Sequence, residues 1–120
     1  MRISLGLPNR PFTAIKNGTK KVEGRVTTSD TDKYKDLKTG DIITFTNEDT
    51  GEFMDVNIKF VHHYKDTRSM LETEGVENVL SSEPKTIEAG IEGYHKLYDY
   101  EKNIPLFGIY AIGVKPRTFS

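Results

Sequence analysis

Hydrophobic and polar residues alternate along two stretches of this chain, and the alternation predicts half-buried β-strands. The first stretch covers residues 3–7, and the second covers residues 53–61 almost without interruption. Residues 42–46 are rich in β-branched and aromatic side chains, and a turn sequence, Asp-Thr-Gly at 49–51, separates them from the second stretch. The pattern therefore predicts an antiparallel hairpin of these two segments and a separate short strand at the N-terminus.

Helical spacing predicts the elements between these strands. Apolar residues recur every three or four positions from Thr86 onward, which indicates an amphipathic helix with Tyr94, Leu97 and Tyr98 on its core-facing side. Residues 105–114 are mostly apolar and predict a buried closing strand. Shorter helices are expected over residues 9–17, 66–71 and 75–80.

Short strands, one hairpin and a few inserted helices do not make the alternating βα units of a parallel sheet. They predict an α+β fold, a small mixed β-barrel with flanking helices, and a packed α+β sandwich is the alternative. Single cores typically serve roughly 100 to 200 residues. The 120 residues are therefore expected to form a single domain, 1–120.

The composition narrows the class of protein. With 35% hydrophobic and 29% charged residues, the chain is typical of a soluble globular protein. It contains no cysteine, which excludes disulfides, zinc-thiolate sites and a cysteine nucleophile. No apolar run approaches the ~20 residues of a membrane span. We therefore expect a cytoplasmic protein with no membrane partner, and no sequence feature indicates an oligomeric state.

Positive charge is concentrated in the first third of the chain. Residues 1–40 carry nine basic and four acidic side chains, a local charge of +5, whereas the whole chain has a net charge of -1. A basic face would attract phosphate groups, while a net charge near zero disfavours strong, non-specific nucleic-acid binding. The alternative is that the basic residues are scattered over the surface. Residues 27–38 are polar and predict a surface loop without chemistry of its own.

The stretch from Gly18 to Arg25 carries the most concentrated chemistry. The guanidinium of Arg25 offers a planar fork of donors, and a carboxylate such as Glu23 can accept from an exocyclic amine. Strand alternation places Lys21, Glu23 and Arg25 on one face, and Lys20 joins them only if the backbone bends after Gly18. We expect Lys20, Lys21, Glu23 and Arg25 to bind a polar nucleobase or nucleotide. The alternative is a surface salt bridge worth about 0 to 1 kcal/mol.

Other polar and aromatic residues point less clearly to a site. His62 and His63 are adjacent in a predicted strand, so their side chains lie on opposite faces and do not form one metal site. No metal ligand cluster and no cofactor are expected. Most aromatic residues belong to the core by their periodicity, and Tyr64, Tyr98 and Tyr110 are the candidates for stacking a base.

The motif Gly18-x-Lys20-x-x-Glu23-x-Arg25, followed by Gly40-Asp41-x-Ile43-x-Phe45, resembles the ASCH domain of the PUA-like superfamily. The resemblance extends to the segment from Phe107 to Ile112 and covers roughly residues 3 to 115. It implies a β-barrel flanked by helices, with a cleft into which the lysine, glutamate and arginine of the motif project. It also implies an RNA-binding or modified-nucleoside-binding module, the function we favour.

One branch of this family implies the alternative function. It is an amidohydrolase that removes the acyl group from acetylated cytidine, with a threonine at the position of Glu23 and with the motif lysine and a distal glutamate assisting. For this chain the alternative is a metal-free amidohydrolase acting on acetylated cytidine nucleosides, since no metal ligand cluster is expected. This chain keeps Lys20 and Arg25 but lacks that threonine. If the chain is an enzyme, Lys20 and Glu23 are its expected catalytic residues, with Glu23 activating water and Lys20 polarising the acyl oxygen.

Overall fold

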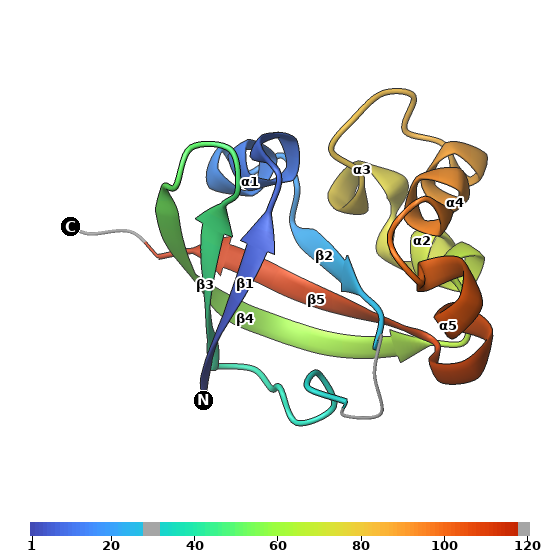
Figure 1. Cartoon of the computed structure of the whole chain (residues 1–120), viewed down its shortest axis with the longest axis horizontal. Coiled ribbons are helices and arrows are strands. Elements are labelled where there is room, and N and C mark those ends of the chain that lie inside the picture. The colour runs from blue at the N-terminus through green and yellow to red at the C-terminus, as the bar shows by residue number, and fades with distance from the viewer. Residues whose placement is uncertain (28–31, 118–120) are drawn as a thin grey trace.

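Five strands form one strongly curled, mixed sheet in the order β1-β3-β4-β5-β2 (Figure 1). The computed structural model describes residues 1–27 and 32–117. β1 pairs with β3 in parallel, and the other neighbours are antiparallel. The strands are β1 (Arg2–Leu7), β2 (Val22–Arg25), β3 (Ile42–Asn47), β4 (Phe53–Tyr64) and β5 (Ile109–Pro116). The sheet is a half-barrel, and the predicted α+β fold is confirmed.

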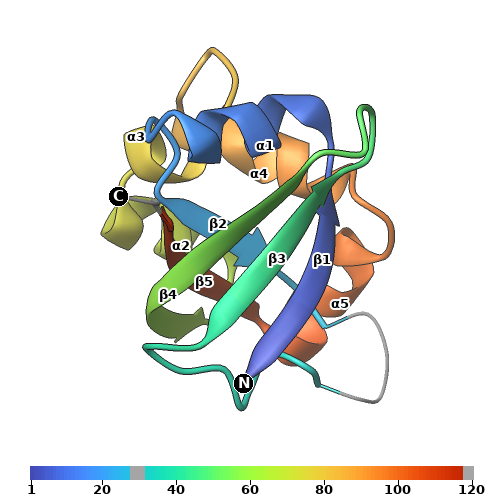
Figure 2. The same cartoon turned by 90° about the vertical axis from the view of Figure 1, so that its left-hand side faces the viewer.

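The helices lie on two sides of the curled sheet. Helix α1 (Asn9–Lys16) crosses one end of the half-barrel beside β1, β3 and β4 (Figure 1 and Figure 2). The other helices gather beyond β2; they are α2 (Thr67–Glu74), α3 (Val76–Val79), α4 (Ile87–His95) and α5 (Tyr100–Phe107). None of the helices in the described ranges has the length and apolar content needed to cross a membrane.

Two hydrophobic clusters hold these layers together, and β5 contributes to both. Ile112 belongs to the cluster beneath α1, together with Phe12 and Phe45. Its neighbour Ala111 belongs to the cluster beneath α2 to α4, together with Met70 and others. Successive strand residues point to opposite faces, so one strand can serve two cores. Burial of each large apolar side chain stabilises the fold by about 1.5 to 3 kcal/mol.

Local hydrogen bonds explain why the hairpin and the helix starts form where the sequence predicts them. The side chain of Asn47 accepts from the backbone N–H groups of Asp49 and Thr50, at 2.9 and 3.2 Å, and closes the turn between β3 and β4. Asp66 caps α2 and Thr86 caps α4 by accepting backbone N–H groups of the first turn. The predicted hairpin is confirmed.

The C-terminal third differs from its prediction. The helix from Thr86 ends at His95, and Tyr98, which was assigned to the core, is 84% exposed. The chain turns at Asp99, which has a φ of 61°, and then forms α5, which the sequence did not predict. Pro105 lies inside this helix instead of opening a strand, and β5 begins only after Gly108. Apolar residues at 104–107 fit a short helix as well as a strand, so periodicity could not separate the two.

Candidate functional site

A cleft of about 590 Å³ opens between the sheet and the helices. Residues of β1, β2, α3 and α4 line it, together with the turn between α4 and α5 and the loop that precedes β3. Its volume lies within the range of about 300 to 1,000 Å³ typical of small-molecule sites. Lys20, Glu23 and Arg25 are all among its lining residues.

A sharp bend after α1 brings Lys20 into this cleft. Gly18 has a φ of 86°, a conformation that glycine adopts without strain, and the backbone N–H of Lys20 then donates to the carbonyl of Ala14 at 3.0 Å. The next N–H, of Lys21, donates to the carbonyl of Asn78 in α3 at 2.8 Å. The bend that the sequence required for Lys20 to join Glu23 and Arg25 is therefore present.

Lys20 is a buried ammonium group held by two backbone carbonyls and by Glu23. Its Nζ donates to the carbonyls of Val22, at 2.7 Å, and of Val79, and it lies 3.4 Å from Oε1 of Glu23. Burial lowers the pKa of Lys20, and the attraction of Glu23 opposes this shift. These contacts join α3 to β2 and place one positive charge against the carboxylate.

Glu23 also holds Arg25. The Nε of Arg25 donates to Oε2 of Glu23 at 2.8 Å, and its Nη2 donates to the carbonyl of Gly6 in β1 at 2.9 Å. Burial is the largest single influence and acts to lower the pKa of Arg25, but the charge and hydrogen bond of Glu23, together with Tyr100 and Tyr34, outweigh it and raise that pKa above its usual value. The guanidinium is therefore fully charged and fixed in orientation, and its side chain is still 15% exposed.

Two tyrosines form the wall of the cleft behind this network. The hydroxyl of Tyr94 lies so close to Gly24 that a Cβ at this glycine would come within 2.4 Å of it. Tyr94 packs parallel to Tyr100, with ring centroids 6.4 Å apart. Burial, followed by the charge of Glu23, raises the pKa of Tyr94, so its hydroxyl stays neutral. Glycine at position 24 is what permits this approach.

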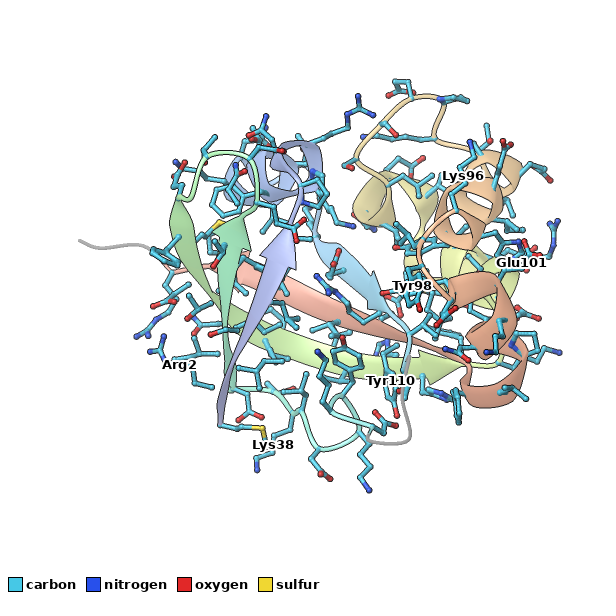
Figure 3. The ribbon with its side chains drawn as sticks, in the orientation of Figure 1. Arg2, Lys38, Lys96, Tyr98, Glu101 and Tyr110 are labelled. Carbon is cyan, nitrogen blue, oxygen red and sulfur yellow. The ribbon has the colours of Figure 1, made fainter. Side chains whose placement is uncertain are left out.

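Tyr98 and Lys33 are among the exposed side chains that line the cleft. Tyr98 projects from the turn between α4 and α5 on the side of the helices that faces β2 (Figure 3), and Lys33 comes from the loop before β3. Of the three tyrosines considered for base stacking, Tyr98 lines the cleft, whereas Tyr64 and Tyr110 do not.

The loop before β3 was predicted to be a polar surface loop without chemistry of its own, and its described part is held by hydrogen bonds and reaches the cleft. Asp32 accepts from the hydroxyl of Tyr110 at 2.6 Å and from the backbone N–H of Tyr34 at 3.0 Å. Tyr34 is buried and, like Lys33, lines the cleft. The apolar residues Tyr34 and Leu37, three positions apart in a polar segment, were the only sequence signal of this docking. Residues 28–31 of the loop lie outside the described residues.

Lys21 is the one expected site residue that does not reach the cleft. Its side chain is exposed and lines a different hollow. Alternation had placed it beside Glu23 and Arg25, but the strand begins only at Val22 and the chain is bent at Lys20 and Lys21. The structure therefore brings together Lys20, Glu23 and Arg25 and separates Lys21 from them.

The two adjacent histidines make separate contacts. His62 lies 2.7 Å from Glu74 and stacks on Phe60, whereas His63 contacts the carbonyl of Phe107 at 2.7 Å. Across residues 1–27 and 32–117, no group of three His, Asp or Glu side chains is arranged to hold a metal ion.

The chain is similar to one protein family and to solved structures of two other proteins. The family model described as "ASCH domain" matches residues 5–118. The crystal structure of the hypothetical protein PH0355 superimposes with a TM-score of 0.82, at 37% identity over 98% of this chain and 100% of that one. The solution structure of protein PF0455 from Pyrococcus furiosus gives 0.74, at 37% identity over 99% of this chain and 100% of that one. No curated protein matches.

Proposed function

Because this chain belongs to the ASCH-domain family, we propose that its cleft binds a nucleobase, presented either by a modified nucleoside or by RNA. The family is one of RNA-binding or nucleoside-processing modules. The observation that carries the proposal is the fixed guanidinium of Arg25 at the edge of the cleft, beside the carboxylate of Glu23. Donors and an acceptor stand side by side there, as the edge of a base requires.

Each side chain of the cleft has a role in this proposal. Arg25 donates to a carbonyl or ring nitrogen of the base, and Glu23 accepts from an exocyclic amine. Because Glu23 and Gly6 already hold the guanidinium, little side-chain entropy is lost when the base binds. Tyr98 at the mouth offers an exposed ring on which a base can stack.

Recognition has more support than hydrolysis. The hydrolytic alternative rests on Lys20 and Glu23, which do lie side by side in the cleft. The Nζ of Lys20 is buried, donates to the carbonyls of Val22 and Val79, and lies 3.4 Å from the carboxylate of Glu23. To polarise an acyl oxygen, Lys20 would have to turn away from Glu23 or give up one of its backbone partners. We therefore propose Lys20 as the residue that orients Glu23.

Titration followed by NMR tests the binding proposal. Cytidine, N4-acetylcytidine and a short single-stranded RNA should each shift the amide resonances of Gly24 and Arg25 if they enter the cleft. Arg25→Lys keeps the charge but loses the planar fork, and it should weaken binding about tenfold. Arg68→Lys makes the same change at a surface residue outside the cleft and should leave binding unchanged.

Two results would contradict the proposal. The first is the absence of any shift near Gly24 and Arg25 with all three ligands. The second is equal weakening by the two arginine variants. Incubation with N4-acetylcytidine tests the hydrolytic alternative. Turnover that is lost in both Lys20→Met and Glu23→Gln would favour hydrolysis over recognition.

A further inference from the structure

A second hollow lies at the end of α1, beside β4 and the C-terminal half of β5. Its volume is about 530 Å³, and of the residues in the described part of the chain it shares Lys20 alone with the cleft. Its floor is apolar, formed by Ile15, Phe60 and Val114, with Gly113 beneath the ring of Phe60. We call it the lysine hollow, because Lys16, Lys21, Lys59 and Lys115 stand exposed around this floor.

The charge of the lysine hollow is one-sided. Among the residues that the structure describes, no Asp or Glu lines it, although the chain as a whole has a net charge of -1. Lys16 is paired with Glu52, whereas Lys21, Lys59 and Lys115 form no ion pair with any residue in the described ranges. Several positive charges that lie together without neighbouring negative side chains raise the local concentration of anions.

The backbone directs these lysines to the hollow from three elements. Lys21 leaves the bend before β2, and Lys115 lies near the end of β5. In β4 the register with β5 shifts between Ile58 and Phe60, so Lys59 is the extra residue of a β-bulge. Bulges re-aim side chains that a regular ladder would direct elsewhere.

We propose that the lysine hollow is a second nucleic-acid contact, which binds a single-stranded RNA through its phosphates. Lys21, Lys59 and Lys115 pair with phosphate groups, and a base packs on the apolar floor beside Phe60. A positive groove next to apolar surface suits a single-stranded nucleic acid, since every base has an apolar face. His62 already stacks on the ring of Phe60, so the base uses the part of this ring that His62 leaves free. A glutamate-rich peptide would satisfy the lysines but leave the floor empty. Binding here does not require a base in the cleft.

Fluorescence anisotropy with a labelled single-stranded RNA of about 12 nucleotides tests this proposal. The variant Lys21→Gln/Lys59→Gln/Lys115→Gln should weaken RNA binding by about tenfold or more at low salt. The slope of log Kd against log salt should fall by about 2, because each phosphate contact on a single strand contributes about 0.7. Phe60→Leu should weaken binding without changing that slope.

The matched control is Lys35→Gln/Lys65→Gln/Lys102→Gln, which removes the same charge from exposed lysines outside both the cleft and the lysine hollow. The proposal is overturned if the two triple variants weaken binding equally, if neither does, or if the wild-type protein does not bind RNA. It is also overturned if a glutamate-rich peptide of equal charge binds as tightly as the RNA. Cytidine titration of the lysine hollow variant reports on the cleft separately, so the failure of one site is distinguishable from the failure of the other.

Discussion

The cleft and the lysine hollow both contain lysine, but the two environments give this residue opposite properties. In the cleft, Lys20 is buried and shares the carboxylate of Glu23 with Arg25, so each charge has a partner inside the protein. In the lysine hollow, Lys21 is exposed and has no ion-pair partner within the described ranges. Paired, buried charges fix geometry, whereas exposed charges of one sign attract a ligand from a distance and are screened by salt. In our proposals, the neighbouring residues Lys20 and Lys21 therefore have different roles: Lys20 orients Glu23, and Lys21 attracts phosphate groups.

The largest expected effect tests whether the charges of the cleft really depend on one another. Glu23→Ala leaves the buried ammonium of Lys20 without its counter-charge, and removal of one partner of a buried pair typically costs about 3 to 5 kcal/mol. We expect a loss of this size in the free energy of unfolding measured with urea.

An exposed pair provides the control for this measurement. Glu52 pairs with Lys16 at the rim of the lysine hollow, and both side chains are about half exposed, at 45% and 57%. Glu52→Ala should change the free energy of unfolding by less than about 1 kcal/mol. If the two variants lose similar stability, the contrast between buried and exposed charge is wrong.

Substitution of two glycines that line the cleft, Gly24 and Gly93, should give smaller changes in stability, and the two changes should have opposite signs. An added Cβ at Gly24 would come within 2.4 Å of the hydroxyl of Tyr94, whereas one at Gly93 would meet no atom within 4 Å. Gly24→Ala should therefore destabilise the protein by about 1 to 3 kcal/mol. Gly93→Ala lies inside α4 and should stabilise it by up to about 1 kcal/mol. Thermal unfolding of both variants checks the signs, and a stable Gly24→Ala protein would contradict the close approach of Tyr94.

The smallest effect concerns the loop that brings Lys33 to the mouth of the cleft. Burial, together with Asp32, raises the pKa of Tyr110 from its ordinary value of 10 to about 12. The neutral phenol therefore stabilises the folded state below pH 10, and this contribution is lost as the pH rises from 10 to about 12. Tyr110→Phe should lose about 1 kcal/mol at pH 8, and this difference from the wild type should shrink across that window.

Urea unfolding at pH 8 and near pH 11.5 measures this change. Tyr98→Phe removes a hydroxyl from a side chain that is 84% exposed, and it should differ from the wild type at neither pH. A Tyr110→Phe difference that stays constant through the window would show that the hydrogen bond to Asp32 does not stabilise the loop.

Local pattern was enough to predict much of the fold. Alternation placed β1 and β4, because residues of a strand must divide between a buried and an exposed face, and β-branched and aromatic content together with the Asp-Thr-Gly turn placed β3. It failed where a short apolar segment suits both a helix and a strand, as around Pro105 in α5. It also failed at Tyr98, since helical spacing continues past the point where Asp99 turns the chain away from the core.

The candidate site was predicted in part for a similar reason. Lys20, Glu23 and Arg25 belong to one short segment, so their chemistry could be read from neighbouring residues. Tyr94 and Lys33 come from segments far along the chain or in a polar loop, and no local pattern links them to Gly24 or Arg25. Only packing of α4 and docking of the loop through Asp32 and Tyr110 place them at the cleft.

By itself, the sequence determined most of the strands and helices, although not α5, and which functional groups the segment from Gly18 to Arg25 carries, since hydrophobic periodicity and side-chain chemistry are local properties. The tertiary structure decided which way those groups face. Lys20 and Lys21 differ by one position, and the bend held by hydrogen bonds to Ala14 and Asn78 sends one into the buried network and leaves the other exposed. Those partners belong to two different helices, so the outcome depends on how distant parts of the chain pack.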